Sequence, residues 1–587
     1  MHRTGLLILT NHVSSLCNGD YIKHIVAGVK RIIKSTLYVH LENTSPVIKD
    51  ARCLASLENF QSPVDVSSSR SEHATFSKDV FPFLSKFYSE AAMQCSNLDV
   101  NILLHNIGNC KHEHKLSRPI QCIIVDSALK PEDKENSSQI LQRFVMSRYQ
   151  QYNYQTIPVV TISDALNMQD DTATKTTPVT SKGSVVIGGT FDHVHIGHKV
   201  LLSEATLMAN RRLLIGLTDG KMLERKTLHE LIKPWSLRKK QLENFLCDVA
   251  DYSVKTDSGN INLNGKKLLE IARITDPIGP SSTDPDLQCI AVSKETEKGG
   301  EIVNKARLEN GLNLLHVHLI GEGHLLGENQ TSAINEVKTS SSTLRYNSLG
   351  DLRKIPNSSE ATFPSEAYVI GLTGGIASGK SSIAKRMEKL GAVIIDCDKL
   401  GHKAYKPGTK TFSKVVERFG SDIVAASGII DRQVLSQKVF GNAQEKSKNL
   451  QDLNSLVWPE IKRLATIQVE EAIKGSEGRK LGTKLICVLD AAVLLEAGWD
   501  AMTNEVWVCT VPPSEAIKRI QERDGRSQED AEMRIQAQMN NKERVARAHV
   551  VLSTFWSPDA TQLQVEKAWK RLEERLQPDW SYDSSLF

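Results

Sequence analysis

The sequence predicts a multidomain α/β protein. Its 587 residues exceed what one hydrophobic core normally organises, and this length predicts roughly three to four domains. In two places, at residues 183–208 and 367–390, an apolar β-rich segment runs into a glycine-bearing turn and then into a helical pattern. That order of strand, turn and helix is typical of parallel α/β folds, and a phosphate site is expected at the first turn of such a domain.

Composition argues against several classes of protein. Apolar residues make up 40% of the chain and charged residues 24%, with a net charge of +4, which are ordinary values for a globular protein. Because no basic tract stands out as a nucleic-acid arm, we expect no nucleic-acid partner. The longest apolar runs are strand-sized, far short of the ~20 residues that span a bilayer, so we expect no membrane span.

Cysteine usage and the N-terminus bear on where the protein resides. The ten cysteines occur singly, with no CxxC pair, which favours a reducing compartment such as the cytoplasm over a disulfide scaffold. Asp20 is the only early acid among several lysines and arginines, which gives the N-terminus a little of the bias of a mitochondrial presequence. The same segment also fits a buried strand at residues 6–10 followed by a polar helix, and we favour that interpretation over a mitochondrial one.

Turn-forming and Ser/Thr-rich stretches divide the chain. They lie at residues 61–71, 164–182 and 349–365. We therefore predict an order of region, linker, domain, linker and domain. The predicted parts are an N-terminal α/β region at 1–163, a linker at 164–182, a middle domain at 183–347, a second linker at 348–366 and a C-terminal domain at 367–587.

The N-terminal region has strand and helix patterns but no reactive constellation. Strands are expected at residues 6–9 and 120–125, and a helix near 76–93. Cys110, His112 and His114 lack a fourth ligand at zinc-site spacing, so we expect no metal site there. We predict a scaffolding, regulatory or degenerate domain that is non-catalytic, and no pattern in it specifies a protein partner.

The middle domain opens with a strand, a tight turn and a helix. We expect a buried strand at residues 185–187, a turn that Gly188 and Gly189 allow, and a helix that residues 190–198 lead into. The apolar positions that follow put one face of this helix against the sheet and leave its N-terminus facing outward. A helix N-terminus favours an anion, because its backbone N–H groups have no partner within the helix.

Two histidines stand at this helix N-terminus, in the sequence GTFDHVHIGH. His195 and His198 are three residues apart and project to the same side, and Gly197 between them lacks the Cβ that would block a phosphate. Nucleotidyl transfer needs donors fixed on the α-phosphate, where negative charge builds in the transition state. A buried histidine pair and a zinc site are the alternatives, and the position after a strand, two glycines and GTFD favours nucleotidyl transfer.

These residues resemble the HxGH nucleotidyltransferase superfamily, and the phosphopantetheine adenylyltransferases in particular. The superfamily's second signature, a Ser/Thr run before a basic residue, is matched by KTSSSTLR at residues 338–345. The resemblance implies a Rossmann-like fold in which Gly189 and Thr190 bind nucleotide and Thr190 bridges ATP to the acceptor phosphate. It implies that His198 and His195 are catalytic, with His198 stabilising the transition state. The residues implied to hold the β- and γ-phosphates are Ser340, Ser341, Ser342 and Arg345.

The same resemblance implies an acceptor-binding lysine after the second strand, which we expect at residues 213–218. Lys221, Lys226 and Lys233 all lie in that segment, and we prefer Lys233. His195 stands where bacterial family members commonly carry Thr. Because other branches of the superfamily share this departure, it bears more on the acceptor than on the chemistry.

The C-terminal domain opens with a P-loop sequence. GGIASGKS follows a strand candidate at residues 368–373 and has the GxxxxGK spacing, followed by Ser. Backbone amides of such a loop wrap the phosphates, Lys380 can bridge β- and γ-phosphoryl oxygens, and the Ser381 hydroxyl can ligate Mg²⁺. The structural alternative is a plain glycine-rich turn before a helix at 382–390. The predicted nucleotide-binding residues are Gly374, Gly375, Ile376, Ala377, Ser378, Gly379, Lys380, Ser381 and Ser382.

Residues downstream favour a kinase over other P-loop proteins. A strand at 393–395 ends in Asp396, with Asp398 close behind, and carboxylates there can meet an acceptor hydroxyl. A GTPase would carry an NKxD motif, and the nearest string, NKER at 541–544, lacks the aspartate. Four arginines suit a lid that closes on ATP, although an exposed helix laced with ion pairs is the alternative. They are Arg519, Arg523, Arg526 and Arg534.

These features together resemble the dephospho-coenzyme A kinases over most of residues 368–564. Besides the P-loop, the match includes DCD at 396–398, a strand ending in Asp490, and RDGRS at 523–527. Trp458 stands where bacterial members usually have His, which bears on the substrate pocket rather than on the reaction.

The kinase resemblance implies a role for five residues. Asp396 would be the general base that takes the proton of the ribose 3′-hydroxyl, and Asp398 would bind substrate. Arg523 and Arg526 would stabilise the transferring phosphoryl group together with Lys380.

The order of the two domains resembles that of the eukaryotic bifunctional coenzyme A synthases. The implied reactions convert ATP and 4′-phosphopantetheine to dephospho-coenzyme A and diphosphate, and then phosphorylate dephospho-coenzyme A with a second ATP. Both would use Mg²⁺, and tethering the two sites raises the local concentration of the intermediate. Two alternatives stay open: the middle domain uses another acceptor, or it is a non-catalytic nucleotide-binding scaffold beside an active kinase.

Overall fold

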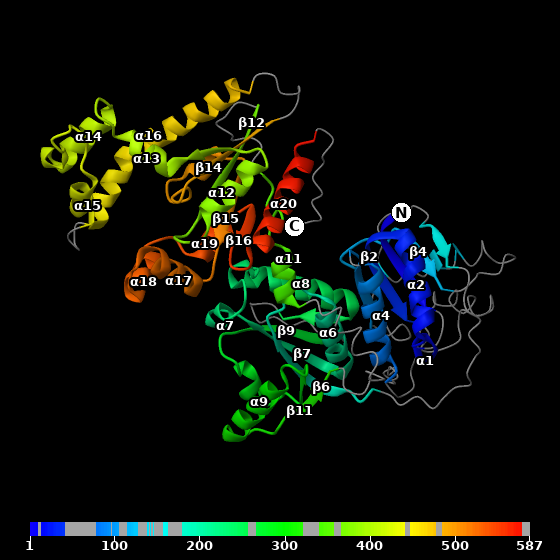
Figure 1. Ribbon diagram of the computed structural model, residues 1–587. Coiled ribbons are helices and arrows are strands. Elements are labelled where there is room, and N and C mark those ends of the chain that lie inside the picture. Colours follow the sequence, from blue (N-terminus) through cyan, green and yellow to red (C-terminus); the bar gives the residue numbers. More distant parts are fainter. Residues whose placement is uncertain are drawn as a thin grey trace. The chain divides into compact units, whose positions relative to one another are not determined.

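The structure of the chain, a computed structural model, divides into two compact units, Met1–Leu344 and Arg345–Phe587 (Figure 1). The N-terminal region and the middle domain thus share the first unit, and the C-terminal domain forms the second. The residues that the structure describes are 1–9, 13–41, 78–95, 97–104, 114–126, 138–139, 141–142, 145, 149, 157–162, 179–255, 266–320, 340–356, 366–440, 446–476 and 484–577.

The N-terminal region contains a parallel five-stranded sheet, which confirms the predicted α/β class. The strand order is β3-β2-β1-β4-β5, so β1 lies in the middle and the chain adds strands first on one side and then on the other. The strands are β1 (His2–Leu9), β2 (Ile33–Leu41), β3 (Asp99–Leu103), β4 (Cys122–Val125) and β5 (Val159–Thr161), with helices α1 (Val13–Leu16), α2 (Gly19–Ile32) and α4 (Val80–Gln94).

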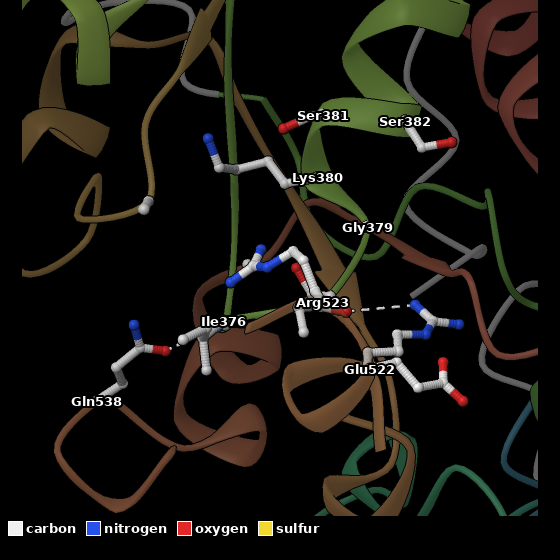
Figure 2. Close-up of a pocket in the computed structure, with 14 residues that line it drawn as sticks. Ile376, Gly379, Lys380, Ser381, Ser382, Glu522, Arg523 and Gln538 are labelled. Atoms are coloured by element: carbon white, nitrogen blue, oxygen red, sulfur yellow. Dashed lines mark hydrogen bonds between the residues drawn. The ribbon is translucent and has the colours of Figure 1, made fainter. Parts of the chain in front are cut away.

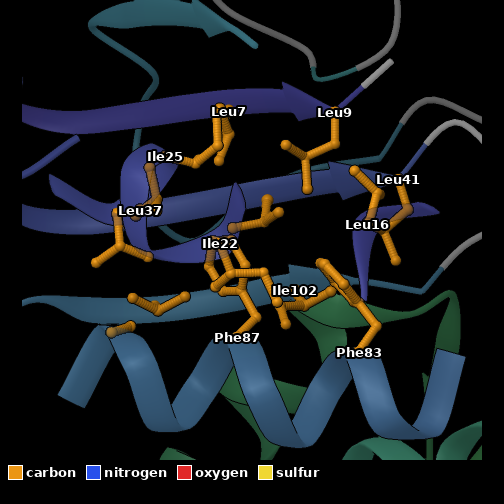
Figure 3. Packing of buried hydrophobic residues seen from close by; sticks show 14 of the residues in the cluster. Leu7, Leu9, Leu16, Ile22, Ile25, Leu37, Leu41, Phe83, Phe87 and Ile102 are labelled. Carbon is orange, nitrogen blue, oxygen red and sulfur yellow. The ribbon is translucent and has the colours of Figure 1, made fainter. Parts of the chain in front are cut away.

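Two amphipathic helices supply the core of this region. The buried positions of α2 recur every three or four residues, as in Ile22, Ile25 and Val29, so one face of the helix packs on the sheet. Figure 3 shows Phe83 and Phe87 of α4 directed toward the strands, where they join the same hydrophobic cluster. Burial of such side chains contributes about 1.5–3 kcal/mol each, so the region has a core of its own.

The middle domain contains a six-stranded parallel sheet of order β11-β10-β6-β7-β9-β8, which is Rossmann-like except that β9 lies between β7 and β8. β6 lies between β7 and β10, so the direction of strand addition reverses at its carboxyl end. Such a switch point is where open α/β sheets bind ligands. The strands are β6 (Lys182–Gly189), β7 (Ala209–Thr218), β8 (Tyr252–Val254), β9 (Lys267–Ile274), β10 (Cys289–Val292) and β11 (His316–Leu319). The helices are α6 (Ile196–Met208), α7 (Lys221–Glu224), α8 (Trp235–Val249), α9 (Glu297–Glu309) and α11 (Ser341–Asn347), with 3₁₀ turns at His229–Leu231 and Gly279–Ser282.

The C-terminal unit contains a five-stranded parallel sheet of order β13-β14-β12-β15-β16, with the P-loop strand β12 at its centre. Helices α13 to α16 are inserted between β13 and β14 (Figure 1). The strands are β12 (Ala367–Gly374), β13 (Val393–Asp396), β14 (Leu485–Asp490), β15 (Glu505–Thr510) and β16 (Val550–Ser553). The helices are α12 (Lys380–Lys389), α13 (Cys397–Ala404), α14 (Lys410–Phe419), α15 (Arg432–Phe440), α16 (Lys446–Lys474), α17 (Pro513–Asp524), α18 (Gln528–Gln536), α19 (Asn541–Arg547) and α20 (Pro558–Arg575), with 3₁₀ turns at Ser421–Ile423 and Trp499–Met502.

Part of the segment expected as the second linker packs on this unit. Leu349 is buried, Leu352 forms an antiparallel bridge with Val550, and the Arg353 N–H donates to the carbonyl of His549 at 2.7 Å. Residues 349–354 therefore extend the sheet edge at β16. Most of the first expected linker, at 163–178, lies outside the described residues.

The metal and membrane expectations can be compared with the structure only in part. Cys110 and His112 lie outside the described residues, whereas the ring of His114 pairs with Asp251 at 3.0 Å. Within the ranges that the structure describes, no cluster of three metal-ligating side chains occurs. None of the helices described combines the length and apolar composition that a membrane span requires.

Candidate active sites

The first candidate site is the turn between β6 and α6, at the switch point of the middle sheet. A Cβ on Gly189 would lie 2.7 Å from the ring of Phe191, so this position requires glycine. Phe191 has a φ of 44°, which is unusual for a non-glycine residue. Its ring is buried, and the centroids of the Phe191 and His198 rings are 4.9 Å apart. Strained backbone of this kind gathers at functional sites.

The two predicted histidines lie together at this turn. The rings of His195 and His198 stack with centroids 3.9 Å apart, and Gly197 between them is exposed. Nδ1 of His198 lies 2.8 Å from the carbonyl oxygen of His193. Because a carbonyl oxygen only accepts, Nδ1 carries the proton and Nε2 is the unprotonated nitrogen of the neutral ring.

Burial sets the charge of this pair. It lowers the pKa of His195 to about 3, with further lowering by His198 and His193. Burial also lowers the pKa of His198, against the opposing effects of the His193 carbonyl and the Asp192 charge. Both rings are therefore neutral near pH 7 in the free protein, and the negative charge of a bound triphosphate would favour their protonation.

A buried arginine that was not predicted from the sequence donates hydrogen bonds to backbone carbonyls at and around this turn. Arg238 on α8 has no exposed surface and donates to the carbonyls of Thr190 at 2.8 Å, Thr218 at 2.9 Å and Lys233 at 2.8 Å. The hydroxyl of Thr218 donates to that of Thr190 at 3.0 Å, which fixes the threonine of GTFD. No sequence signal distinguishes Arg238 from its basic neighbours, because its role depends on carbonyls distant in sequence.

Asp192 connects the preferred acceptor lysine to the turn. Its carboxylate accepts from the backbone N–H of Lys233 at 2.9 Å, and Lys233 is half-buried. Lys221 and Lys226 are exposed. This contact holds the backbone of Lys233 at the HxGH turn, and it does not involve the ammonium group.

The second signature begins helix α11. The Ser340 hydroxyl accepts from the N–H of Thr343 at 3.1 Å, so this serine caps the first turn, in which Ser341 and Ser342 also lie. Arg345 is buried, and the compact units divide between Leu344 and Arg345.

The second candidate site is the P-loop at the end of β12. A Cβ on Gly374 would lie 2.7 Å from the carbonyl oxygen of Cys509, and one on Gly379 would lie 2.7 Å from the side chain of Thr554. Gly379 and Ala377 have φ of 84° and 60°, so the loop uses left-handed backbone twice. These values explain why the loop needs glycine where the motif places it.

The loop encloses a pocket of about 610 Å³ (Figure 2). All nine P-loop residues predicted to bind nucleotide line it, from Gly374 through Ser382. The remaining lining residues are Ala492, Arg519, Glu522, Arg523 and Gln538.

Lys380 is held between two carboxylates at this pocket. Its Nζ pairs with Asp490 at the end of β14 and with Asp398 at 3.2 Å. Burial would lower the pKa of Lys380, but Asp490 and Asp398 outweigh it and raise that pKa, so the ammonium stays charged. Asp490 was not among the predicted site residues, although a buried apolar run that ends in Asp beside the P-loop strand could have indicated it.

Asp396 lies beside this cluster, in register with Asp490 across β13 and β14. Its carboxylate caps α13 by accepting from the N–H of Lys399 at 2.9 Å, and it pairs with the Lys399 ammonium at 2.9 Å. Burial would raise the pKa of Asp396, but these Lys399 contacts lower it, so the group is ionised at neutral pH. Its direct partner is thus Lys399 rather than Lys380.

The predicted lid arginines divide into two groups. Arg523 lines the pocket while pairing with Asp524, and Arg519 donates to the Ala377 carbonyl of the P-loop at 3.3 Å. Arg526 is not among the lining residues and pairs with Asp530 at 2.6 Å, as in the alternative of an ion-paired helix.

Two further side chains that the sequence analysis missed touch the P-loop. The amide oxygen of Gln538 accepts from the N–H of Ile376 at 2.8 Å (Figure 2). A Cβ on Gly375 would lie 3.2 Å from a guanidinium nitrogen of Arg544, which is buried and pairs with Glu496 at 3.3 Å. Both lie after the lid, and only the fold brings them to the loop.

Comparisons with known proteins match three parts of the chain. Family models match residues 3–158 (COASY N-terminal domain), 186–271 (cytidylyltransferase-like) and 368–555 (dephospho-CoA kinase). The dephospho-CoA kinase of Geobacter sulfurreducens is 36% identical over 203 residues, which cover 35% of this chain and 98% of that protein. The chain belongs to the bifunctional coenzyme A synthase family.

Other relatives of the kinase unit give the same picture. The dephospho-CoA kinase of Moorella thermoacetica is 34% identical over 212 residues, covering 36% of this chain and 95% of the relative. The dephospho-CoA kinase of Symbiobacterium thermophilum is 38% identical over 202 residues, which cover 34% of this chain and 80% of that relative. As a coenzyme A synthase, the protein is a bifunctional, ATP-using enzyme of coenzyme A biosynthesis that acts on small nucleotide substrates.

Proposed function

We propose that the middle domain joins ATP to 4′-phosphopantetheine and that the C-terminal unit phosphorylates the ribose 3′-hydroxyl of the dephospho-coenzyme A so formed. The observation that carries the proposal is Lys380, which lies between Asp490 and Asp398 at a P-loop pocket. The stacked pair of His195 and His198 at the switch point supports the first reaction.

The kinase site supplies groups for each part of phosphoryl transfer. The ribose 3′-oxygen attacks the γ-phosphorus, the bond from that phosphorus to the β-bridging oxygen breaks, and ADP leaves. Ionised Asp396 accepts the hydroxyl proton, and Asp398 orients the substrate. Lys380 leaves its carboxylate partners for the β- and γ-phosphates, and Arg523 with Arg526 from the lid offset the charge on the transferring group.

The donor set at this pocket fits Mg²⁺. The Ser381 hydroxyl lines the pocket in the first turn of α12, and Asp490 and Asp398 converge on Lys380 beside it, so the available ligands are all oxygens. Ser381 would hold the ion. A bound Mg²⁺ supplies positive charge that neutralises the β- and γ-oxygens.

The HxGH turn suits adenylyl transfer. An oxygen of the acceptor phosphate attacks the α-phosphorus of ATP, the bond to the bridging oxygen breaks, and diphosphate leaves. His198 and His195 face the α-phosphate, where they offset the charge that builds in the transition state. Gly189 and Thr190 bind the nucleotide, Lys233 binds the acceptor phosphate, and Ser340, Ser341, Ser342 and Arg345 hold the β- and γ-phosphates.

Cysteine chemistry supports a reducing location such as the cytoplasm. The eight cysteines among the described residues are all free thiols. Disulfides would be expected in an oxidising compartment.

The test uses full-length protein with 4′-phosphopantetheine, ATP and Mg²⁺, and follows products by mass spectrometry. His198→Ala should block all products from phosphopantetheine but still convert added dephospho-coenzyme A. Lys380→Ala should accumulate dephospho-coenzyme A. Each variant is thus the control for the other.

Three results would contradict parts of the proposal. If the two variants behave alike, the division of labour is wrong. Release of ADP without diphosphate would make the middle domain a scaffold. Preference for another phosphorylated acceptor in competition would keep the chemistry and change the substrate.

A further inference from the structure

Lys199, the residue that follows His198, belongs to the middle domain, but its side chain contacts the N-terminal region. Its Nζ lies 2.6 Å from a carboxylate oxygen of Asp99, 2.5 Å from the carbonyl of Val100 and 2.9 Å from the amide oxygen of Asn101. An ammonium has three protons, and each here has an acceptor. All three acceptors belong to β3 of the N-terminal region.

This contact is buried. The Lys199 side chain is 8% exposed, and lysine is almost never so buried unless it is paired. Burial lowers the pKa of Lys199, opposed by the charge of Asp99, and Lys199 in turn holds the pKa of Asp99 below its usual value against the effect of burial. Because three directional hydrogen bonds end on one strand, a small rotation of α6 would break them.

The backbone of the same residue closes the turn that carries both histidines. The Lys199 N–H donates to the carbonyl of His195 at 2.9 Å, which completes the first turn of α6. His195 is the N-cap of this helix and His198 lies within the turn. One residue therefore ties the first turn of α6 to β3.

Helix α6 is shared between two hydrophobic cores. Leu202 and Ala205 belong to the core of the middle domain. Ile196, Val200 and Leu207 pack instead against the core of the N-terminal region. The N-terminal region thus contacts α6 along its length, from the first turn to the last.

We propose that the N-terminal region is a positioning domain for adenylyl transfer and that Lys199 is its positioning residue. By pairing with Asp99 and Asn101, Lys199 fixes the first turn of α6, and with it the directions of His195 and His198. The inference rests on the adenylyl transfer proposed above. Misplacement of a reacting group by about 1 Å can cost about 100-fold in rate, so the contact bears directly on turnover.

A second polar contact between the same regions provides a matched control. The hydroxyl of Tyr38 on β2 donates to the carboxylate of Asp248 on α8 at 2.8 Å, and Tyr38 is buried. This contact also joins the N-terminal region to the middle domain, but it ends on α8 and not on α6. Loss of the Tyr38 hydroxyl weakens the interface without releasing the first turn of α6.

The experiment compares Lys199→Met, Asp99→Asn and Tyr38→Phe in the full-length protein. Diphosphate release from ATP and 4′-phosphopantetheine gives kcat and KM, and phosphorylation of added dephospho-coenzyme A reports on the kinase unit. Lys199→Met should lower the adenylyl-transfer kcat by about 10- to 100-fold while KM for ATP stays within about twofold. Asp99→Asn should lower kcat less, and Tyr38→Phe should leave it within about twofold. The kinase rate should not change in any variant.

Two results would overturn the inference. One is a Lys199→Met protein that keeps its kcat, and the other is a Tyr38→Phe protein that loses as much as Asp99→Asn, because general loosening would then explain both. If Lys199→Met does not fold, Asp99→Asn decides by the same criteria, since asparagine keeps the shape and one acceptor oxygen. Absence of diphosphate release from the parent protein would instead refute the proposed adenylyl transfer.

Discussion

Burial of His195 makes the stability of the folded protein depend on pH. Its pKa is about 3 in the folded protein against 6.5 in an exposed histidine. The unfolded chain therefore binds a proton more tightly between those values, and folding stability falls as pH falls below 6.5. Between pH 7 and pH 5 the loss attributable to this group should be about 1–2 kcal/mol.

The measurement is the free energy of unfolding of the full-length protein by denaturant at pH 7 and pH 5. His195→Gln should remove part of the loss, because glutamine does not titrate. If the free energy of unfolding depends on pH equally in the parent and the variant, His195 is not buried in a neutral state.

Substitution of Asp490 tests whether its ion pair with Lys380 matters for kinase activity. Asp490→Asn removes the charge next to Lys380 and one oxygen suited to Mg²⁺, so the kinase kcat should fall by about 10- to 1,000-fold. The adenylyl-transfer rate, measured as diphosphate release, should not change. Asp422→Asn is the matched control, because Asp422 forms an exposed pair with Lys438 and such pairs contribute little. A similar loss in both variants would refute a specific role for Asp490.

Residues within a motif could be predicted, and residues that reach it from elsewhere could not. His195, His198 and Lys380 stand in short patterns that follow a strand and a glycine turn, and this local context predicts a phosphate site. Arg238 and Lys199 act through acceptors far away in sequence, and nothing next to them reveals those acceptors. Asp490 lies between these two cases. The apolar run that ends in this carboxylate is visible in the sequence, but the pairing of its strand β14 with the P-loop strand β12 is not.

The pairing of strands β12 and β15 explains why residue 374 of the P-loop must be glycine. Gly374 is the last residue of β12 and pairs in register with Cys509 of β15. A Cβ there would lie 2.7 Å from the Cys509 carbonyl oxygen, which sheet pairing keeps from moving. Gly374→Ala should therefore abolish kinase turnover and lower the free energy of unfolding by about 1–3 kcal/mol.

Gly401 offers the contrasting glycine in the same unit. It lies inside α13, and a Cβ there would meet only Ile461, at an ordinary 3.5 Å. Because alanine is favoured over glycine in a helix by about 1 kcal/mol, Gly401→Ala should keep or raise stability, measured by denaturant unfolding. Destabilisation by both variants would mean that the P-loop geometry is not what makes Gly374 necessary.

Elements with local signals were predicted, and the order of strands was not. The strand, glycine turn and helix at 185–208 and at 367–390 were predicted because apolar runs and glycines lie next to one another. In the N-terminal region only two of the five strands, β1 and β4, were expected. The other three are defined by pairing, since β2 pairs with β1, β3 with β2 and β5 with β4. Sheet order depends on contacts between distant segments, which single-sequence patterns do not contain.

The whole chain divides close to the segment that composition suggested as a linker, but part of that segment packs on the C-terminal unit. The two compact units are Met1–Leu344 and Arg345–Phe587, and the turn-rich composition of 348–366 suggested a linker. Residues 349–354 are polar enough to resemble a linker, yet Leu349 is 1% exposed. Its backbone carbonyl accepts from the ammonium of Lys567 on α20, which lies 218 residues away in sequence, and a contact over that distance is not visible in composition.

A comparison of two fragments tests this boundary. In the C-terminal unit the Lys567 ammonium donates to the Leu349 carbonyl at 3.2 Å and pairs with Asp351 at 2.6 Å, while Leu352 packs on the kinase core. A fragment that starts at residue 367 loses these contacts, and burial of one leucine alone contributes about 1.5–3 kcal/mol. The fragment 345–587 should therefore be more stable than 367–587 by about 2–4 kcal/mol, measured by denaturant unfolding, and Leu349→Ala in the longer fragment should remove about half of the difference. Equal stability of the two fragments would mean that residues 349–354 only connect the domains.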